Sequence, residues 1–217
     1  MTDKKFELTD LATGKKSTLD VKTPTIGPNV LNIAPLAKDH DVFTFDPGFM
    51  STASCESKIT YIDGDKGILL HRGIPIEQLA EKSNFLEVSY LLINGELPNT
   101  TQLTEFSHAI QYHTMLNESL LRFFNGFHYN AHPMAMLSGV VASMSAFYHD
   151  SMDINNPRHR EIFAHRIIAK IPTIAAAAYK HSLGQPFIYP RNDLDYCSNL
   201  LNMFFSVPCE NYHVDPV

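Results

Sequence analysis

The sequence has few cysteines and no long basic or apolar run, and each shortage excludes a class of protein. Its three cysteines are an odd number without C-x-x-C spacing, which argues against a disulfide framework and against a structural zinc site. The chain has 17 basic and 23 acidic residues, and its basic residues form no run that could follow a phosphate backbone. We therefore expect no nucleic-acid partner. Its most apolar segment, residues 134–148, is shorter than the roughly 18 residues that a membrane span needs.

Several catalytic and targeting signatures are also absent. The sequence contains no G-x-S-x-G, no Walker loop and no G-x-G-x-x-G, so it gives no direct sign of a hydrolase, a phosphate-binding loop or a dinucleotide fold. His128 and His132 are four residues apart but have no carboxylate between them, and we interpret them as loop histidines. The two lysines near the N-terminus are not followed by an apolar stretch, which is unlike a secretory signal. The cysteine usage fits a reducing cytoplasm.

What is present fits one large domain or the better part of two, because the 217 residues are 44% hydrophobic. Residues 1–75 are predicted to form a β-rich N-terminal region. Two short strands are expected around Thr13 and Gly14. A second hairpin is expected around residues 63–67, where glycines can adopt the positive φ of tight turns.

Residues 76–217 are predicted to be helical. Asn84 followed by Glu87 resembles a capping box, and its helix is expected to stop at Asn94-Gly95. Two helical stretches are expected at 101–115 and 118–127.

A longer helix is expected to open near Pro133, and its small residues predict close approach of a partner helix, within the chain or in a second subunit. Asn156-Pro157 predicts another helix start. Pro172 is expected to end that helix and to start the next. The final helix is predicted at 194–206.

Arg166 and Lys170 are the most interesting charged pair, because they lie four apart and thus on one face of a helix. Like charges at this spacing repel mildly, and a bound anion would relieve that repulsion. From the residues alone, a solvated basic face is the preferred interpretation. Cys209 is likewise interpreted as a small buried side chain.

Five motifs then suggest a family. In chain order they are FTFDPGFMSTASCESKITYIDGDKGILLHRGIPI at 43–76, NGELP at 94–98, AHPMAM at 131–136, NNPRHREI at 155–162 and GQPFIYPRND at 184–193. The chain closely resembles the N-terminal portion of the citrate synthases of Gram-negative bacteria, in the branch that NADH regulates.

The resemblance implies a mainly α, multi-helical fold with a small β-rich N-terminal region, here truncated. It implies condensation of acetyl-CoA with oxaloacetate and water to citrate and CoA in the tricarboxylic acid cycle, without a required cofactor. It also implies a homodimer or a hexamer in the cytoplasm. The family's catalytic aspartate and two histidines match no position in this chain, so the piece alone is predicted to be inactive. Asp46 and His71 lie in motifs that are interpreted as structural.

The resemblance also implies an allosteric NADH site, at positions that match His113, Thr114, Met115, Tyr148, Arg166, Lys170 and Cys209. Arg166 and Lys170 would hold the pyrophosphate, and Tyr148 and Met115 would offer packing surface. The chain departs from the family's pattern at Tyr112, at Val207 and at residues 128–130, which predicts weaker or differently tuned NADH binding.

Two alternatives stay open. One is a non-catalytic helical module that binds a nucleotide or pairs with another subunit. The other, within the family, is 2-methylcitrate synthase, which would use propionyl-CoA.

Overall fold

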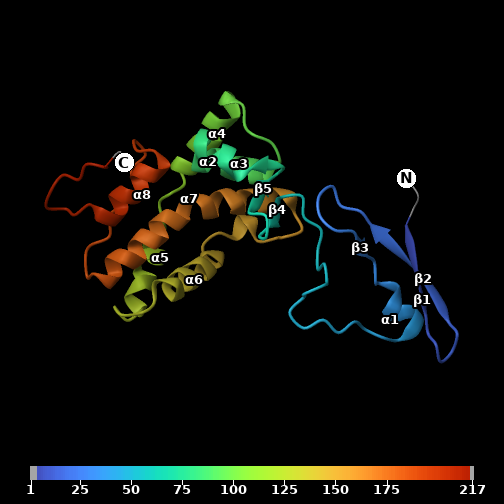
Figure 1. Ribbon diagram of the computed structural model, residues 1–217. Coiled ribbons are helices and arrows are strands. Elements are labelled where there is room, and N and C mark those ends of the chain that lie inside the picture. Colours follow the sequence, from blue (N-terminus) through green and yellow to red (C-terminus); the bar gives the residue numbers. More distant parts are fainter. Residues whose placement is uncertain (1–3, 216–217) are drawn as a thin grey trace. The chain divides into compact units, whose positions relative to one another are not determined.

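Residues 4–215 are described by a computed structural model. The chain divides into two units between Glu96 and Leu97, and Figure 1 shows the elements of both. Each unit is described by itself. Most residues of secondary structure are helical, as predicted. No helix among the described residues has the length and apolarity needed to cross a bilayer.

The first unit combines two small sheets with short helices. In chain order its elements are β1 (Lys5–Thr9), β2 (Lys16–Lys22), β3 (Val30–Leu31), α1 (Pro35–His40), β4 (Thr60–Asp63), β5 (Ile68–His71), β6 (Ile74–Pro75), α2 (Ile76–Lys82) and α3 (Phe85–Asn94). One antiparallel sheet has the order β1-β2-β3, and the other has the order β4-β5-β6.

Both predicted hairpins are confirmed. β1 pairs with β2 from Lys5↔Asp20 to Thr9↔Lys16, and Gly14 in the connecting turn has a φ of +73°. β4 pairs with β5 around the turn at 64–67, in which Gly67 has a φ of +64°. An L side chain rarely adopts such a φ, so glycine fits both turns.

Arg72 fastens the second sheet to α3. This residue has a φ of +51°, which is unusual for a residue with a side chain. Its Nε and Nη2 donate to the Leu92 carbonyl at 3.2 and 2.5 Å, and its Nη1 donates to the Lys58 carbonyl at 3.3 Å. Three charge-assisted hydrogen bonds therefore hold the backbone in this conformation.

The capping box that begins α3 is confirmed. The Asn84 side chain accepts from the Glu87 N–H at 2.9 Å, and the Glu87 carboxylate accepts from the Asn84 N–H at 3.1 Å. The helix ends at Gly95, whose φ is +97°. Its start and stop signals are therefore local to the sequence.

The second unit is helical. In chain order its elements are α4 (Thr100–Gln111), α5 (Glu118–Arg122), η1 (Phe123–Gly126), α6 (Pro133–Ser143), η2 (Met144–Ala146), η3 (His149–Ser151), α7 (Pro157–Ser182) and α8 (Tyr196–Phe205), where η marks a 3₁₀ helix. The long helix α7 contacts α4, α6 and α8, and Figure 1 shows it in orange.

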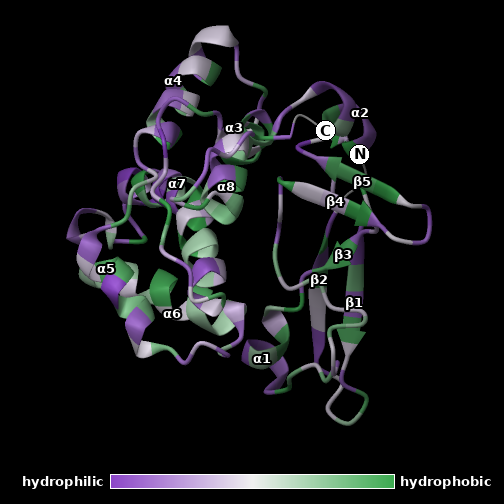
Figure 2. Cartoon of the chain, turned by 90° about the vertical axis from the view of Figure 1, so that its left-hand side faces the viewer, coloured by the Kyte–Doolittle hydropathy of each residue, from purple (hydrophilic) through white to green (hydrophobic). Residues whose placement is uncertain are grey.

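The core of this unit lies between α5, η1, α6 and α7. Phe124, Met136, Val140 and Ile174 are completely buried in it. Helix α5 carries both hydrophobic and hydrophilic residues in Figure 2, and it buries Leu120 and Leu121. Burial of apolar surface of this kind is the main favourable contribution to folding.

The predicted close approach at the small residues of α6 is confirmed at Gly139. A Cβ atom added at Gly139 would lie only 3.1 Å from Cζ of Phe127. The absence of a side chain at this position thus admits an aromatic ring against the helix. Helix α6 also packs against α7. Ala135, Ser138 and Ala142 are exposed, so a partner for them in a second subunit stays a prediction.

The prediction that Pro172 ends a helix is wrong. Helix α7 continues through Pro172 to Ser182, and Pro172 itself is buried. A proline has no N–H, so the carbonyl of Ile168, four residues earlier, loses its helical donor. The Tyr196 hydroxyl of α8 donates to that carbonyl at 2.9 Å, so packing against α8 replaces the missing hydrogen bond.

The helix predicted at 101–115 extends too far at its C-terminal end. α4 stops at Gln111, and residues 113–115 leave the helix because groups from α7 bind their carbonyls, as described below. The other predicted helices agree within about two residues, including α7 at its Asn156 N-cap and α8 at 196–205.

Candidate anion-binding site

Six of the seven residues expected at a nucleotide site lie on three segments that α7 brings together. Arg166 and Lys170 belong to α7, Tyr148 precedes η3, and residues 113–115 follow α4. The contacts below link these segments directly.

The Arg166 guanidinium is held by hydrogen bonds and by contact with an aromatic ring. Its Nη1 and Nη2 donate to the two Asp150 carboxylate oxygens at 2.9 and 3.0 Å, and Nη1 also donates to the Ser151 hydroxyl at 2.6 Å. Its Cζ lies 4.3 Å from the centre of the Tyr148 ring. This bidentate pairing with a carboxylate holds the pKa of Asp150 below its usual value.

Lys170 is buried at the same face of α7. Its ammonium donates to the carbonyls of His113 and Met115 at 2.8 and 2.5 Å, and it lies 5.3 Å from the centre of the Tyr148 ring. Burial, together with the nearby charge of Arg166, lowers the pKa of Lys170 to about 8. Two of its three N–H donors are thus engaged by backbone.

The Tyr148 ring lies against both cations. It faces both Arg166 and Lys170, an arrangement in which the π electrons attract positive charge. Burial raises the pKa of its hydroxyl. The ring therefore stays neutral and forms one wall of the site at ordinary pH.

Residues 113–115 form a short loop that α7 holds in place. Besides the two Lys170 contacts, Thr173 donates its hydroxyl to the buried Thr114 carbonyl at 2.8 Å. The His113 ring nitrogen Nδ1 lies 2.6 Å from the Ala109 carbonyl. Met115, in contrast, is 59% exposed and so offers an apolar side chain to a ligand.

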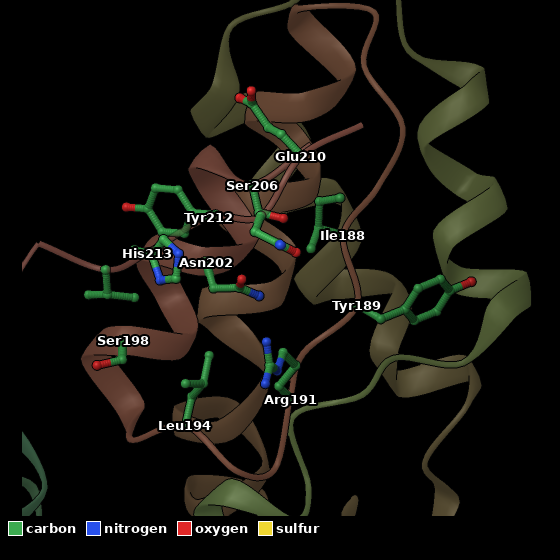
Figure 3. A pocket seen from close by; sticks show the side chains of 12 residues that line it. Ile188, Tyr189, Arg191, Leu194, Ser198, Asn202, Ser206, Glu210, Tyr212 and His213 are labelled. Atoms are coloured by element: carbon green, nitrogen blue, oxygen red, sulfur yellow. The ribbon is translucent and has the colours of Figure 1, made fainter. Parts of the chain in front are cut away.

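The seventh expected residue, Cys209, lies on a different segment from the other six. Cys209 is exposed in the segment after α8, which corrects the expectation of a buried side chain. Among the described residues it makes no hydrogen bond to any of the other six expected residues. It lies in the segment that borders a cavity of about 570 Å³, which Arg191, Asn202 and His213 help to line (Figure 3).

Sequence reasoning missed three residues of the site. Asp150 and Ser151 bind the guanidinium, and Thr173 fastens the 113–115 loop. Thr173 lies near Lys170 on α7 and could have been suspected from that spacing. No sequence signal pairs Asp150 with an arginine 16 residues away.

Asp46 and His71 lie in the motifs that were interpreted as structural, and their surroundings differ. The Asp46 carboxylate accepts hydrogen bonds from the backbone of Met50 and Ser51 and from the Thr52 hydroxyl, so it organises its own loop. His71 ends β5, and its Nδ1 is buried without a hydrogen-bond partner among the described residues. Within residues 4–215, no group of three or more potential metal-ligating side chains is arranged to hold a metal ion.

A family model described as citrate synthase, C-terminal domain, matches residues 48–216. The chain belongs to the citrate synthase family. Solved structures of citrate synthases agree with this assignment. That from Pyrobaculum aerophilum is 33% identical, covers 70% of this chain and has a TM-score of 0.63. That from Thermotoga maritima MSB8 is also 33% identical, covers 75% of this chain and has a TM-score of 0.63.

A third citrate synthase supports the fold. The enzyme from Thermoplasma acidophilum, solved as a ternary complex with carboxymethyl coenzyme A and oxaloacetate, is 24% identical over 71% of this chain, with a TM-score of 0.66. The chain spans only 40–42% of the length of these three citrate synthases.

Proposed function

We propose that the chain is part of a citrate synthase that condenses acetyl-CoA with oxaloacetate and water to citrate and CoA. The family match over residues 48–216 carries this proposal. Because the matched citrate synthases are more than twice as long as the aligned part, we infer that residues outside this chain supply the base and the polarising groups.

A measurement of CoA release tests this proposal. The 217-residue chain is compared with the product of the complete reading frame that contains it, each with acetyl-CoA and oxaloacetate. We expect release by the longer product and none by the 217-residue chain. Release by the shorter chain would show that the assignment of the chemistry to residues outside it is wrong.

For the second unit we propose a regulatory anion site that takes the pyrophosphate of NADH, as in the Gram-negative branch of the family. One observation carries it: Arg166 and Lys170, two cations on one helical face, both lie against the Tyr148 ring. A nucleotide pyrophosphate would satisfy the positive charge, and the exposed Met115 and the Tyr148 ring offer surface for the rest of the ligand.

The two cations have different roles in this proposal. Arg166 has a fork of N–H donors that matches phosphate oxygens, so it is the direct anion contact. Lys170 holds the 113–115 loop through its carbonyls and keeps one N–H donor for a ligand. NADH is thus expected to act as an inhibitor of the complete enzyme, and no cofactor is required for the reaction.

NADH binding tests the regulatory site. Titration followed by nicotinamide fluorescence should show binding to the native chain and a loss of at least about tenfold in affinity for Arg166→Ala, because a charge-assisted contact is removed. The matched control is Arg158→Ala, which removes an exposed arginine of the same helix that is paired with Glu161. If both variants lost the same affinity for NADH, the loss would reflect the change in net charge, and this result would contradict the proposed site.

A further inference from the structure

The guanidinium that would bind the anion already holds a carboxylate. Both Asp150 oxygens lie within 3.0 Å of the Arg166 nitrogens, in the two-point geometry that arginine also uses for phosphate. Asp150 thus occupies the position from which a phosphate oxygen pair would contact Arg166.

We propose that Asp150 is an intramolecular competitor for anions at Arg166, so that it must be displaced before a phosphate group binds and thereby sets the affinity of the site. The inference rests on the proposed regulatory function in one respect, namely that the anion belongs to a nucleotide. It concerns the affinity of the site and not the reaction itself.

Asp150 and Arg166 differ in how firmly they are held. The Asp150 side chain is 63% exposed, whereas the Arg166 side chain is only 14% exposed. Asp150 lies in η3, a single turn of 3₁₀ helix. An exposed carboxylate on one short turn can rotate into water at little cost, so it can leave the guanidinium without disturbing the helix.

The guanidinium stays in position when Asp150 leaves. Ser151 still accepts from Nη1 at 2.6 Å, and the Tyr148 ring still lies 4.3 Å from Cζ. Arg166 also projects from the middle of a 26-residue helix. The donors that Asp150 releases therefore stay directed toward the position that its carboxylate oxygens leave.

Charge favours the replacement when the anion is a phosphate. A carboxylate brings one negative charge to Arg166, while a pyrophosphate group brings at least two, and the buried charge of Lys170 on the same helical face adds to the attraction. The competitor therefore excludes weak anions, such as free carboxylates, more effectively than it excludes polyphosphates. The result is a site whose affinity is lower than its arginine alone would give.

The test is the Asp150→Asn variant, which keeps the shape of the side chain and removes its charge. Isothermal titration of the native chain and the variant with inorganic pyrophosphate, and separately with NADH, should show affinity increased by roughly tenfold for both probes. Glu161→Gln is the matched control, since it removes one carboxylate from an exposed arginine pair on the same helix, and it should change neither affinity. The gain should disappear in the double variant Asp150→Asn, Arg166→Ala.

The outcomes separate this inference from the proposed function. Unchanged or weaker pyrophosphate binding in Asp150→Asn would overturn it, because Asp150 would then position the guanidinium rather than compete for it. Absence of pyrophosphate binding in both proteins would overturn it too. Tighter pyrophosphate binding without any NADH binding would uphold the competitor and refute the nucleotide assignment. Equal NADH affinity in the native chain and the variant would uphold the nucleotide site and refute the competitor.

Discussion

Removal of the buried charge of Lys170 should change how stability depends on pH. Burial lowers the pKa of Lys170 from 10.5 to about 8. One pKa unit corresponds to about 1.4 kcal/mol, so the charged form is disfavoured in the folded state by about 3 kcal/mol. Lys170→Met removes the titrating group and keeps a side chain of similar length.

The sign follows from proton binding. Because the folded pKa lies below the usual value, the unfolded chain binds more protons than the folded chain between about pH 8 and pH 10.5. The free energy of unfolding therefore rises with pH in this window. Between about pH 7 and about pH 9.5, the titration of Lys170 should raise the free energy of unfolding of the native chain by about 2 kcal/mol. This contribution should be missing from Lys170→Met.

Urea unfolding of both proteins, followed by far-UV circular dichroism at these two pH values, measures the difference. Other groups cancel in the comparison. They include Tyr196, whose pKa burial raises to about 12. Lys82→Met, at an exposed lysine of α2, is the control and should give a constant difference. If the native chain and Lys170→Met differ by the same free energy at both pH values, the reasoning about the buried charge is refuted.

Three further predictions concern stability. Tyr196→Phe should cost about 1–3 kcal/mol because it leaves the partly buried Ile168 carbonyl without its donor. In a Pro172→Ala background the new N–H can reach that carbonyl, so a urea double-mutant cycle should give a smaller cost, and an unchanged cost would contradict the replacement argument. Asn84→Ala should lower the free energy of unfolding by about 1 kcal/mol in thermal melts, whereas Asn84→Asp should retain most of it, because only the capping oxygen matters. Phe124→Ala should cost about 3–5 kcal/mol in urea unfolding because Phe124 is completely buried; the control Phe123→Ala, at a 45% exposed ring, should cost much less, and equal losses would contradict the packing described for the core.

Local signals in the sequence predicted much of the fold. The Asn84–Glu87 capping box, the Asn156 N-cap and the positive φ at Gly14, Gly67 and Gly95 all involve residues within a few positions of one another. Interactions over so short a distance depend little on the rest of the chain. For this reason, hairpins and helix starts were predicted well.

The errors arose where distant segments decide the outcome. Helix α7 passes through Pro172 because Tyr196, on another helix, donates to the carbonyl that proline leaves free. α4 ends at Gln111 while α7 groups bind the carbonyls of residues 113–115. Neither partner could be inferred from the sequence near the error.

The sequence by itself determined the family, the order of the elements and the pairing of Arg166 and Lys170 on one face, because motifs and helical periodicity are properties of the linear chain. Only the tertiary structure decided what those two cations contact. It placed Asp150 on Arg166, buried Lys170 against two carbonyls and left Cys209 exposed after α8. These contacts join segments 16 to 57 residues apart, and packing of the helices around α7, rather than any local preference, brings them within hydrogen-bonding distance.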